Sequence, residues 1–257
     1  MTGALAAGFW GLVGGSALLL GAGIAWFTRL PRRLIAAVMA IGSGVLISAV
    51  AFDLMDEAYK QGGFVATASG FIGGALAYTG ANVALARRGA RHRKRSGNAP
   101  HAQQPAADAP ESGGTGLAIA VGALLDGIPE SVVIGVSLLG GGGVSAVTVA
   151  AVFLSNVPEG LSSAAGMKQA GRSAAYVFGV WGTIALVSGV AAMVGNVALA
   201  GAAPETLAAV TAVAAGAILA MLVDTMIPEA TEATHDYSGL IAVIGFLIAF
   251  VLTKSGG

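Results

Sequence analysis

Long apolar runs separated by short polar stretches make up most of this chain. Runs such as Leu5–Phe27 and Ala174–Ala200 are long enough for a helix to cross a bilayer, which takes roughly 20 residues. Shorter runs reach that length once the polar stretches beside them are included. We predict eight transmembrane helices, at 4–27, 34–59, 63–86, 116–139, 144–168, 174–199, 205–232 and 238–253.

The composition agrees with this pattern. Hydrophobic residues make up 56% of the chain and charged residues 10%, with a mean hydropathy of +0.81. Soluble domains carry roughly 25% charged residues. A soluble protein with this composition would have too few charged side chains to cover its surface. The absence of cysteine excludes disulfides and thiolate metal sites. We therefore predict an all-α integral membrane protein.

The basic residues predict an orientation. Eleven of the 13 Lys and Arg fall in one set of alternate loops, and only Lys60 and Lys254 fall on the other side. Cytoplasmic loops are enriched in Lys and Arg. We therefore expect a multi-pass protein with both termini on the extracytoplasmic side.

A polar segment at 87–114 divides the chain into three helices in 1–86 and five in 115–257. The segment opens with the basic run Arg91–Arg95 and continues with Ser, Asn, Pro, Gln, Gly and Ala. This composition is typical of disorder, so we predict a disordered cytoplasmic loop. The basic run is better explained as a topology signal near anionic lipid than as a nucleic-acid site, and we expect no nucleic-acid partner.

Acidic side chains interrupt two of the apolar helices. Asp126 and Glu130 are four residues apart, as are Ser155 and Glu159, and this spacing places each pair on one helix face. An acid at the centre of a transmembrane helix costs about 2.5–3.5 kcal/mol. Together with Asn156, these side chains predict an oxygen-rich site for a divalent cation.

Prolines accompany these acids. Pro129 and Pro158 lie inside the two pairs, and Pro228 precedes Glu229 in a later helix. Proline removes a backbone hydrogen bond and kinks a helix, which would leave carbonyl oxygens available to a cation. The alternative is that the prolines serve helix packing alone.

Two further acidic clusters lie on opposite sides of the predicted membrane. The stretches Asp53–Ala58 and Thr225–Ala230 are weakly alike, as in transporters built from inverted repeats. We interpret the clusters as the two mouths of a cation path, which includes Asp53, Asp224, Glu229 and Glu232. Ordinary acids at the membrane–water interface are the alternative for Asp56, Glu57, Glu232 and Asp236.

These features resemble the ZIP (Zrt/Irt-like) divalent metal transporters over nearly the whole chain. The resemblance rests on eight helices, extracytoplasmic termini, an inner loop after the third helix, and Pro-Glu motifs in helices four and five. It implies an inverted 3+2+3 repeat and a homodimer in a bacterial inner membrane. The family's metal ligands fall on Asp126, Gly127, Glu130, Ser155, Asn156 and Glu159.

The chain departs from the family motifs at three positions. Asp126 and Ser155 stand where the family has histidine, and Gly127 replaces an asparagine. Imidazole favours zinc, whereas carboxylate and carbonyl oxygens suit Mn²⁺, Mg²⁺ or Ca²⁺. Zinc also accepts carboxylates, so both manganese and zinc stay open. A mononuclear site is favoured over a binuclear one.

We therefore expect a transporter that imports divalent metal ions towards the cytoplasm by alternating access. The metal is its substrate, and no permanently bound cofactor is expected; the ion and the lipid bilayer are its partners. The alternatives are a carrier of a non-metal substrate on the same scaffold and a metal sensor without flux. An intramembrane protease using Asp126 and Asp224 lacks the expected flanking motifs, so we expect no enzyme.

Overall fold

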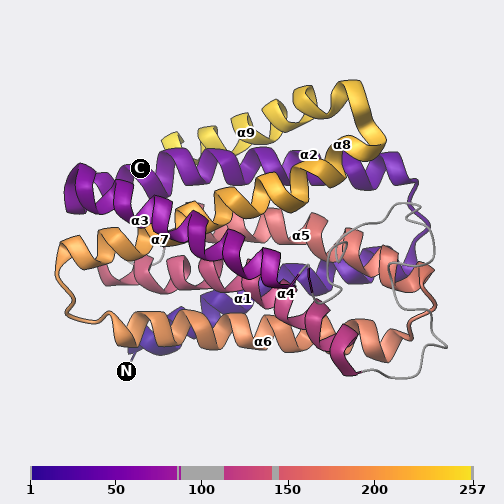
Figure 1. Ribbon diagram of the computed structural model, residues 1–257, viewed down its shortest axis with the longest axis horizontal. Helices are drawn as coiled ribbons and strands as arrows, with labels where there is room; N and C mark the ends of the chain where they lie inside the picture. The colour runs from indigo at the N-terminus through magenta and orange to yellow at the C-terminus, as the bar shows by residue number, and fades with distance from the viewer. Residues whose placement is uncertain (1, 86, 88–112, 141–144, 256–257) are drawn as a thin grey trace.

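The computed structural model describes residues 2–85, 87, 113–140 and 145–255. In these segments the regular secondary structure is helical (Figure 1). The α-helices are α1 (Thr2–Phe27), α2 (Arg32–Ala49), α3 (Met55–Leu85), α4 (Gly113–Ser137), α5 (Ala146–Gln169), α6 (Ala174–Ala198), α7 (Pro204–Met221), α8 (Ile227–Thr234) and α9 (Ser238–Ser255). Shorter helical elements are the π-helices η1 (Val50–Leu54) and η4 (Leu222–Met226) and the 3₁₀-helices η3 (Leu138–Gly140) and η5 (His235–Tyr237).

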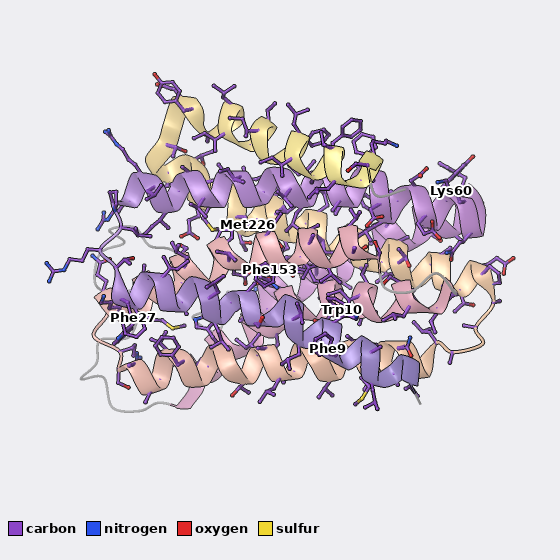
Figure 2. All side chains as sticks on the ribbon, turned by 180° about the vertical axis from the view of Figure 1, so that it is seen from behind. Phe9, Trp10, Phe27, Lys60, Phe153 and Met226 are labelled. Atoms are coloured by element: carbon purple, nitrogen blue, oxygen red, sulfur yellow. The ribbon has the colours of Figure 1, made fainter. Side chains whose placement is uncertain are left out.

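Several of these helices are apolar and long. In the described part of the chain, 5 are long and apolar enough to cross a membrane: Gly3–Phe27, Arg32–Leu85, Ala174–Ala198, Pro204–Glu232 and Ser238–Ser255. Large apolar side chains project from their outer faces, as Phe27 does in Figure 2. Phe27 is 81% exposed, and Leu76 of α3 is 68% exposed. The prediction of an all-α membrane-embedded protein is confirmed at this level.

Figure 1 places the two ends of the described chain at the same end of the bundle. Figure 2 shows Lys60 at one end of the molecule and Phe27 at the other. The connection from α1 to α2 follows Phe27 and carries Arg29. Basic side chains therefore occur at both ends, and Lys60 is distant from the α1–α2 connection.

One predicted boundary needs correction, and two other regions agree with the prediction. The helix that runs through η1 breaks at Gly63, whose φ of +68° suits glycine, and this break agrees with the predicted division between 34–59 and 63–86. The predicted helix 205–232 matches the helical run Pro204–Glu232, which continues from α7 through η4 into α8. The segment 87–114 ends in helix, because α4 begins at Gly113, and 88–112 lie outside the described residues.

Glycines that approach a neighbouring backbone closely occur within two groups of helices, and α2 of one group also packs on α5 of the other. In the first group, α1 packs on α5 and α6, and α4 packs on α6. In the second group, α3 packs on α7, and α2 packs on α8 and α9. Glycines permit these approaches, because a Cβ on Gly160 would overlap the Leu18 carbonyl and a Cβ on Gly44 would overlap the Ala242 carbonyl. Small residues allow membrane helices to pack this closely.

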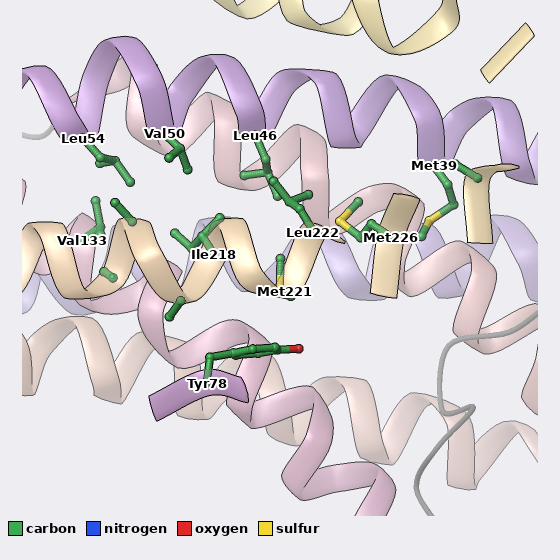
Figure 3. Close-up of a cluster of buried hydrophobic side chains, with 14 of the residues drawn as sticks. Met39, Leu46, Val50, Leu54, Tyr78, Val133, Ile218, Met221, Leu222 and Met226 are labelled. Carbon is green, nitrogen blue, oxygen red and sulfur yellow. The ribbon is translucent and has the colours of Figure 1, made fainter. Parts of the chain in front are cut away.

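Side chains fill much of the boundary between the groups. An apolar cluster joins α2, α3 and α7 of the second group to Val133 of α4 (Figure 3). Its large members include Met221, Leu222 and Met226, which are at most 1% exposed. At the same boundary, Gly42 of α2 faces the ring of Pro158 in α5. Side chains rather than backbone carbonyls therefore make these contacts.

Alanine substitutions test the role of the close glycines. Gly44→Ala and Gly216→Ala should each destabilise the protein by about 1–3 kcal/mol, because the methyl group overlaps a backbone carbonyl. Gly73→Ala is the matched control, since nothing lies within 4 Å of its Cβ. Unfolding in detergent measures all three variants. Equal stability of Gly44→Ala and Gly73→Ala would contradict the packing described.

Candidate functional site

The five residues predicted to bind metal lie on two helices and face the interior. Asp126 and Glu130 lie on α4, and Ser155, Asn156 and Glu159 lie on α5. Their exposed fractions are 1% for Asp126, Glu130 and Ser155, and 4% for Asn156 and Glu159. The four-residue spacing on each helix explains why these side chains share an inward face.

The prolines have different surroundings. Pro129 and Pro158 lie inside α4 and α5, and both helices continue through them. Each lacks the N–H that would bond to the carbonyl four residues earlier, at Leu125 and Leu154. Pro228 is the second residue of α8, directly after η4. The departure from α-helical geometry in this region is the π-helix before Pro228.

A tyrosine of α3 reaches the first acid of the site. Tyr78 Oη donates a hydrogen bond to Asp126 Oδ1 at 2.7 Å. Tyr78 is 2% exposed and belongs to the apolar cluster at the boundary (Figure 3). A phenol that donates to a buried carboxylate offsets part of the free energy of burying its charge. Asp126 is thus held by a group from the opposite side of the boundary.

The neutral residues of α5 bond to nearby backbone. Asn156 Nδ2 donates to the carbonyl of Gly14 in α1 at 3.1 Å. Ser155 Oγ donates to the carbonyl of Val152 at 2.9 Å. A hydroxyl that donates one hydrogen bond keeps acceptor capacity, so Ser155 can still offer an oxygen to a cation. The amide of Asn156 has a second role in tying α5 to α1.

A small cavity lies between the two helix groups. Its volume is about 10 Å³, and its lining includes Asp53, Glu130 and Thr148 among apolar side chains. Thr148 Oγ1 donates to Asp53 Oδ2 at 2.6 Å. A cavity of this size holds about one water molecule. The cavity brings Asp53, predicted for the path, beside Glu130, predicted for the ion site.

The other path residues differ in burial. Glu229 of α8 is 5% exposed, and its Oε1 accepts a hydrogen bond from Ser162 of α5. Asp224 of η4 is exposed, and its Oδ2 accepts a hydrogen bond from Asn82 of α3 at 3.2 Å. Glu232 is exposed near the end of α8. Only Glu229 of these three is therefore an interior residue.

The acids are dispersed rather than gathered. Among the described residues, no three His, Cys, Asp or Glu side chains come together to hold a metal ion. Asp126, Glu130 and Glu159 share an interior without forming a three-acid cluster. An ion bound among them would draw on neutral oxygens as well, or would bring the carboxylates closer together.

Four residues that donate hydrogen bonds to the predicted acids were not predicted from the sequence: Tyr78, Asn82, Thr148 and Ser162. Tyr78 and Asn82 carried a usable signal, because two polar side chains four apart on an apolar helix share one face. Thr148 and Ser162 carried little signal, since hydroxyl side chains are common in membrane helices and bond to their own backbone.

No protein-family model matches this chain, and no curated protein matches it significantly. The resemblance to ZIP transporters therefore rests on the residues themselves, and the ion and the transport activity are proposals.

The Thr148–Asp53 hydrogen bond can be tested by an isosteric substitution. Thr148→Val removes the hydroxyl that donates to Asp53 and should destabilise the protein by about 1–3 kcal/mol. Thr183→Val is the matched control, because the exposed Thr183 hydroxyl bonds only to the Gly179 carbonyl of its own helix. Unfolding in detergent compares the two. Equal loss in both variants would contradict a specific role for the bond.

Proposed function

We propose that this protein is a divalent metal transporter of the cell inner membrane that resembles the ZIP family and imports its ion by alternating access. One observation carries the proposal: three acids, Asp126, Glu130 and Glu159, lie in the interior of an apolar helical bundle. Acids within membrane helices are costly and mark ion or proton pathways. Their position beside a boundary between two helix groups suits a site that opens to each side in turn.

The proposed ion ligands are the carboxylates of Asp126, Glu130 and Glu159, with Ser155 and Asn156 as neutral oxygen donors. Buried carboxylates repel one another, and a divalent cation between them removes that repulsion. The acids are therefore expected to move closer when the ion enters. An oxygen donor set without imidazole favours Mn²⁺ or another hard ion over zinc.

We further propose that the chain spans the membrane eight times as an inverted repeat. Supporting this, α2 and α7 each have 18 residues, and each continues into a π-helix of 5 residues. The sequence Gly-Phe-Trp-Gly at Gly8–Gly11 in α1 also has a counterpart, Gly-Val-Trp-Gly, at Gly179–Gly182 in α6. Close approaches at Gly44 of α2 and Gly216 of α7 agree with the repeat.

The helix groups suggest how access alternates. Glycines bring the helix backbones close together within each group, whereas side chains fill much of the boundary between groups. Contacts between backbone groups at glycines resist sliding, and side chains can adopt new rotamers. We propose that α1, α4, α5 and α6 move against the other helices and carry the ion past the boundary.

Cysteine labelling tests the proposed topology, because the chain has no cysteine of its own. Ser255→Cys and Ala200→Cys should react with a membrane-impermeant maleimide added to intact cells. Gln169→Cys should react only after permeabilisation, since it precedes the basic connection between α5 and α6. The reverse pattern would contradict extracytoplasmic termini.

Uptake into proteoliposomes tests the function. We expect saturable uptake of at least one ion among Zn²⁺, Cd²⁺, Fe²⁺, Mn²⁺, Mg²⁺ and Ca²⁺. Glu130→Gln and Glu159→Gln should nearly abolish it, because each removes an anionic ligand. Glu205→Gln is the matched control, since Glu205 is an exposed acid in the first turn of α7.

Other outcomes separate the alternatives. Binding of an ion without flux would favour a metal sensor. Neither binding nor flux of any ion by the folded protein would favour a carrier of a non-metal substrate. Flux that survives both substitutions would contradict the proposed site.

A further inference from the structure

The hydrogen bond between Tyr78 and Asp126 crosses the boundary between the helix groups. Tyr78 lies on α3 of the second group, and Asp126 lies on α4 of the first group. Both side chains are at most 2% exposed, so water does not replace one partner when the other is removed. The phenol is thus part of the immediate surroundings of a proposed ion ligand while belonging to the other group.

Two further hydrogen bonds cross the same boundary. Thr148 of α5 donates to Asp53 of η1, and Ser162 of α5 donates to Glu229 of α8. In each bond the acceptor is an acid that the sequence analysis placed in the ion path or the ion site. Asp126, Asp53 and Glu229 are therefore oriented by donors of the opposite helix group, and their surroundings depend on how the groups are placed.

Groups that hydrogen-bond to a metal ligand change the affinity of the site. Carboxylate ligands are usually oriented by such groups, and removal of the donor typically lowers metal affinity by roughly 10–100-fold. A donor on the same helix as its carboxylate would act in every conformation. A donor on the opposite helix group acts only while the two groups keep the arrangement described.

We propose that Tyr78 is a positioning residue that makes the affinity of the ion site depend on the arrangement of the helix groups. This inference rests on the proposed transport function. With Tyr78 bonded to Asp126, the carboxylate is oriented and the ion is held tightly. When the groups move, α4 leaves Tyr78, Asp126 loses the hydrogen bond from the phenol, and the site releases the ion more readily.

The first test compares Tyr78→Phe with Tyr59→Phe. Tyr59 lies before the break at Gly63 and is 57% exposed, so its substitution controls for loss of a hydroxyl. In Tyr78→Phe, the Kd for Mn²⁺, measured by isothermal titration calorimetry, should rise by about tenfold or more. The KM for uptake should rise by a similar factor. The maximal rate should not fall, because release no longer requires this bond to break.

The results separate the two proposals. Unchanged Kd and KM in Tyr78→Phe, with flux by the wild type, would overturn the role of Tyr78 and leave the transport function standing. A lower maximal rate at unchanged KM would also overturn it. Absence of both Mn²⁺ binding and metal flux in the wild type would overturn the proposed function itself and this inference with it.

A second measurement does not depend on the Tyr78→Phe variant folding. The chain has four tyrosines, and Tyr59→Phe/Tyr176→Phe/Tyr237→Phe leaves Tyr78 alone. Infrared difference spectra with and without Mn²⁺ then report on its C–O stretch. A shift of this band on addition of the ion is expected, because the ion withdraws charge from the carboxylate that accepts the bond. An unchanged band would overturn the inference.

Discussion

A carboxylate inside a bundle of apolar helices is stable only when other groups bond to it or neutralise it. The described part of the chain buries four acids, Asp126, Glu130, Glu159 and Glu229. Two of them accept hydrogen bonds from the opposite helix group, at Tyr78 and Ser162. Charge burial and helix arrangement are thereby linked, because a shift of one group relative to the other changes what stabilises these acids.

Glycines determine which helices pack with their backbones close together. Within each group, glycines let a helix approach the backbone carbonyls of its neighbour, as Gly44 does on α9 and Gly160 does on α1. Between the groups, apolar side chains pack together, and Glu130 lines a cavity of about 10 Å³. The close glycine approaches thus lie within the groups, and the polar side chains meet at the boundary between them.

The helical class and the interior position of the acids could be predicted from the sequence, since apolar runs and four-residue spacing report directly on helices and their faces. The π-helices η1 and η4 could not, because each is a single wider turn inside a continuing helix, and no residue of Val50–Leu54 or Leu222–Met226 requires that turn. The hydrogen-bond partners of Asp126 and Asp53 could not be predicted either. Tyr78 and Thr148 are 48 and 95 residues away from them along the chain, and such pairings depend on tertiary packing.

A divalent cation is proposed to bind among the buried acids of α4 and α5. Anomalous diffraction from crystals soaked in Mn²⁺ measures this directly, because the metal is located without reference to transport. We expect an anomalous peak within coordination distance of carboxylate oxygens of Glu130 and Glu159, with Asp126 nearby. Peaks confined to exposed acids such as Glu205 or Glu232, with none in the interior, would contradict it.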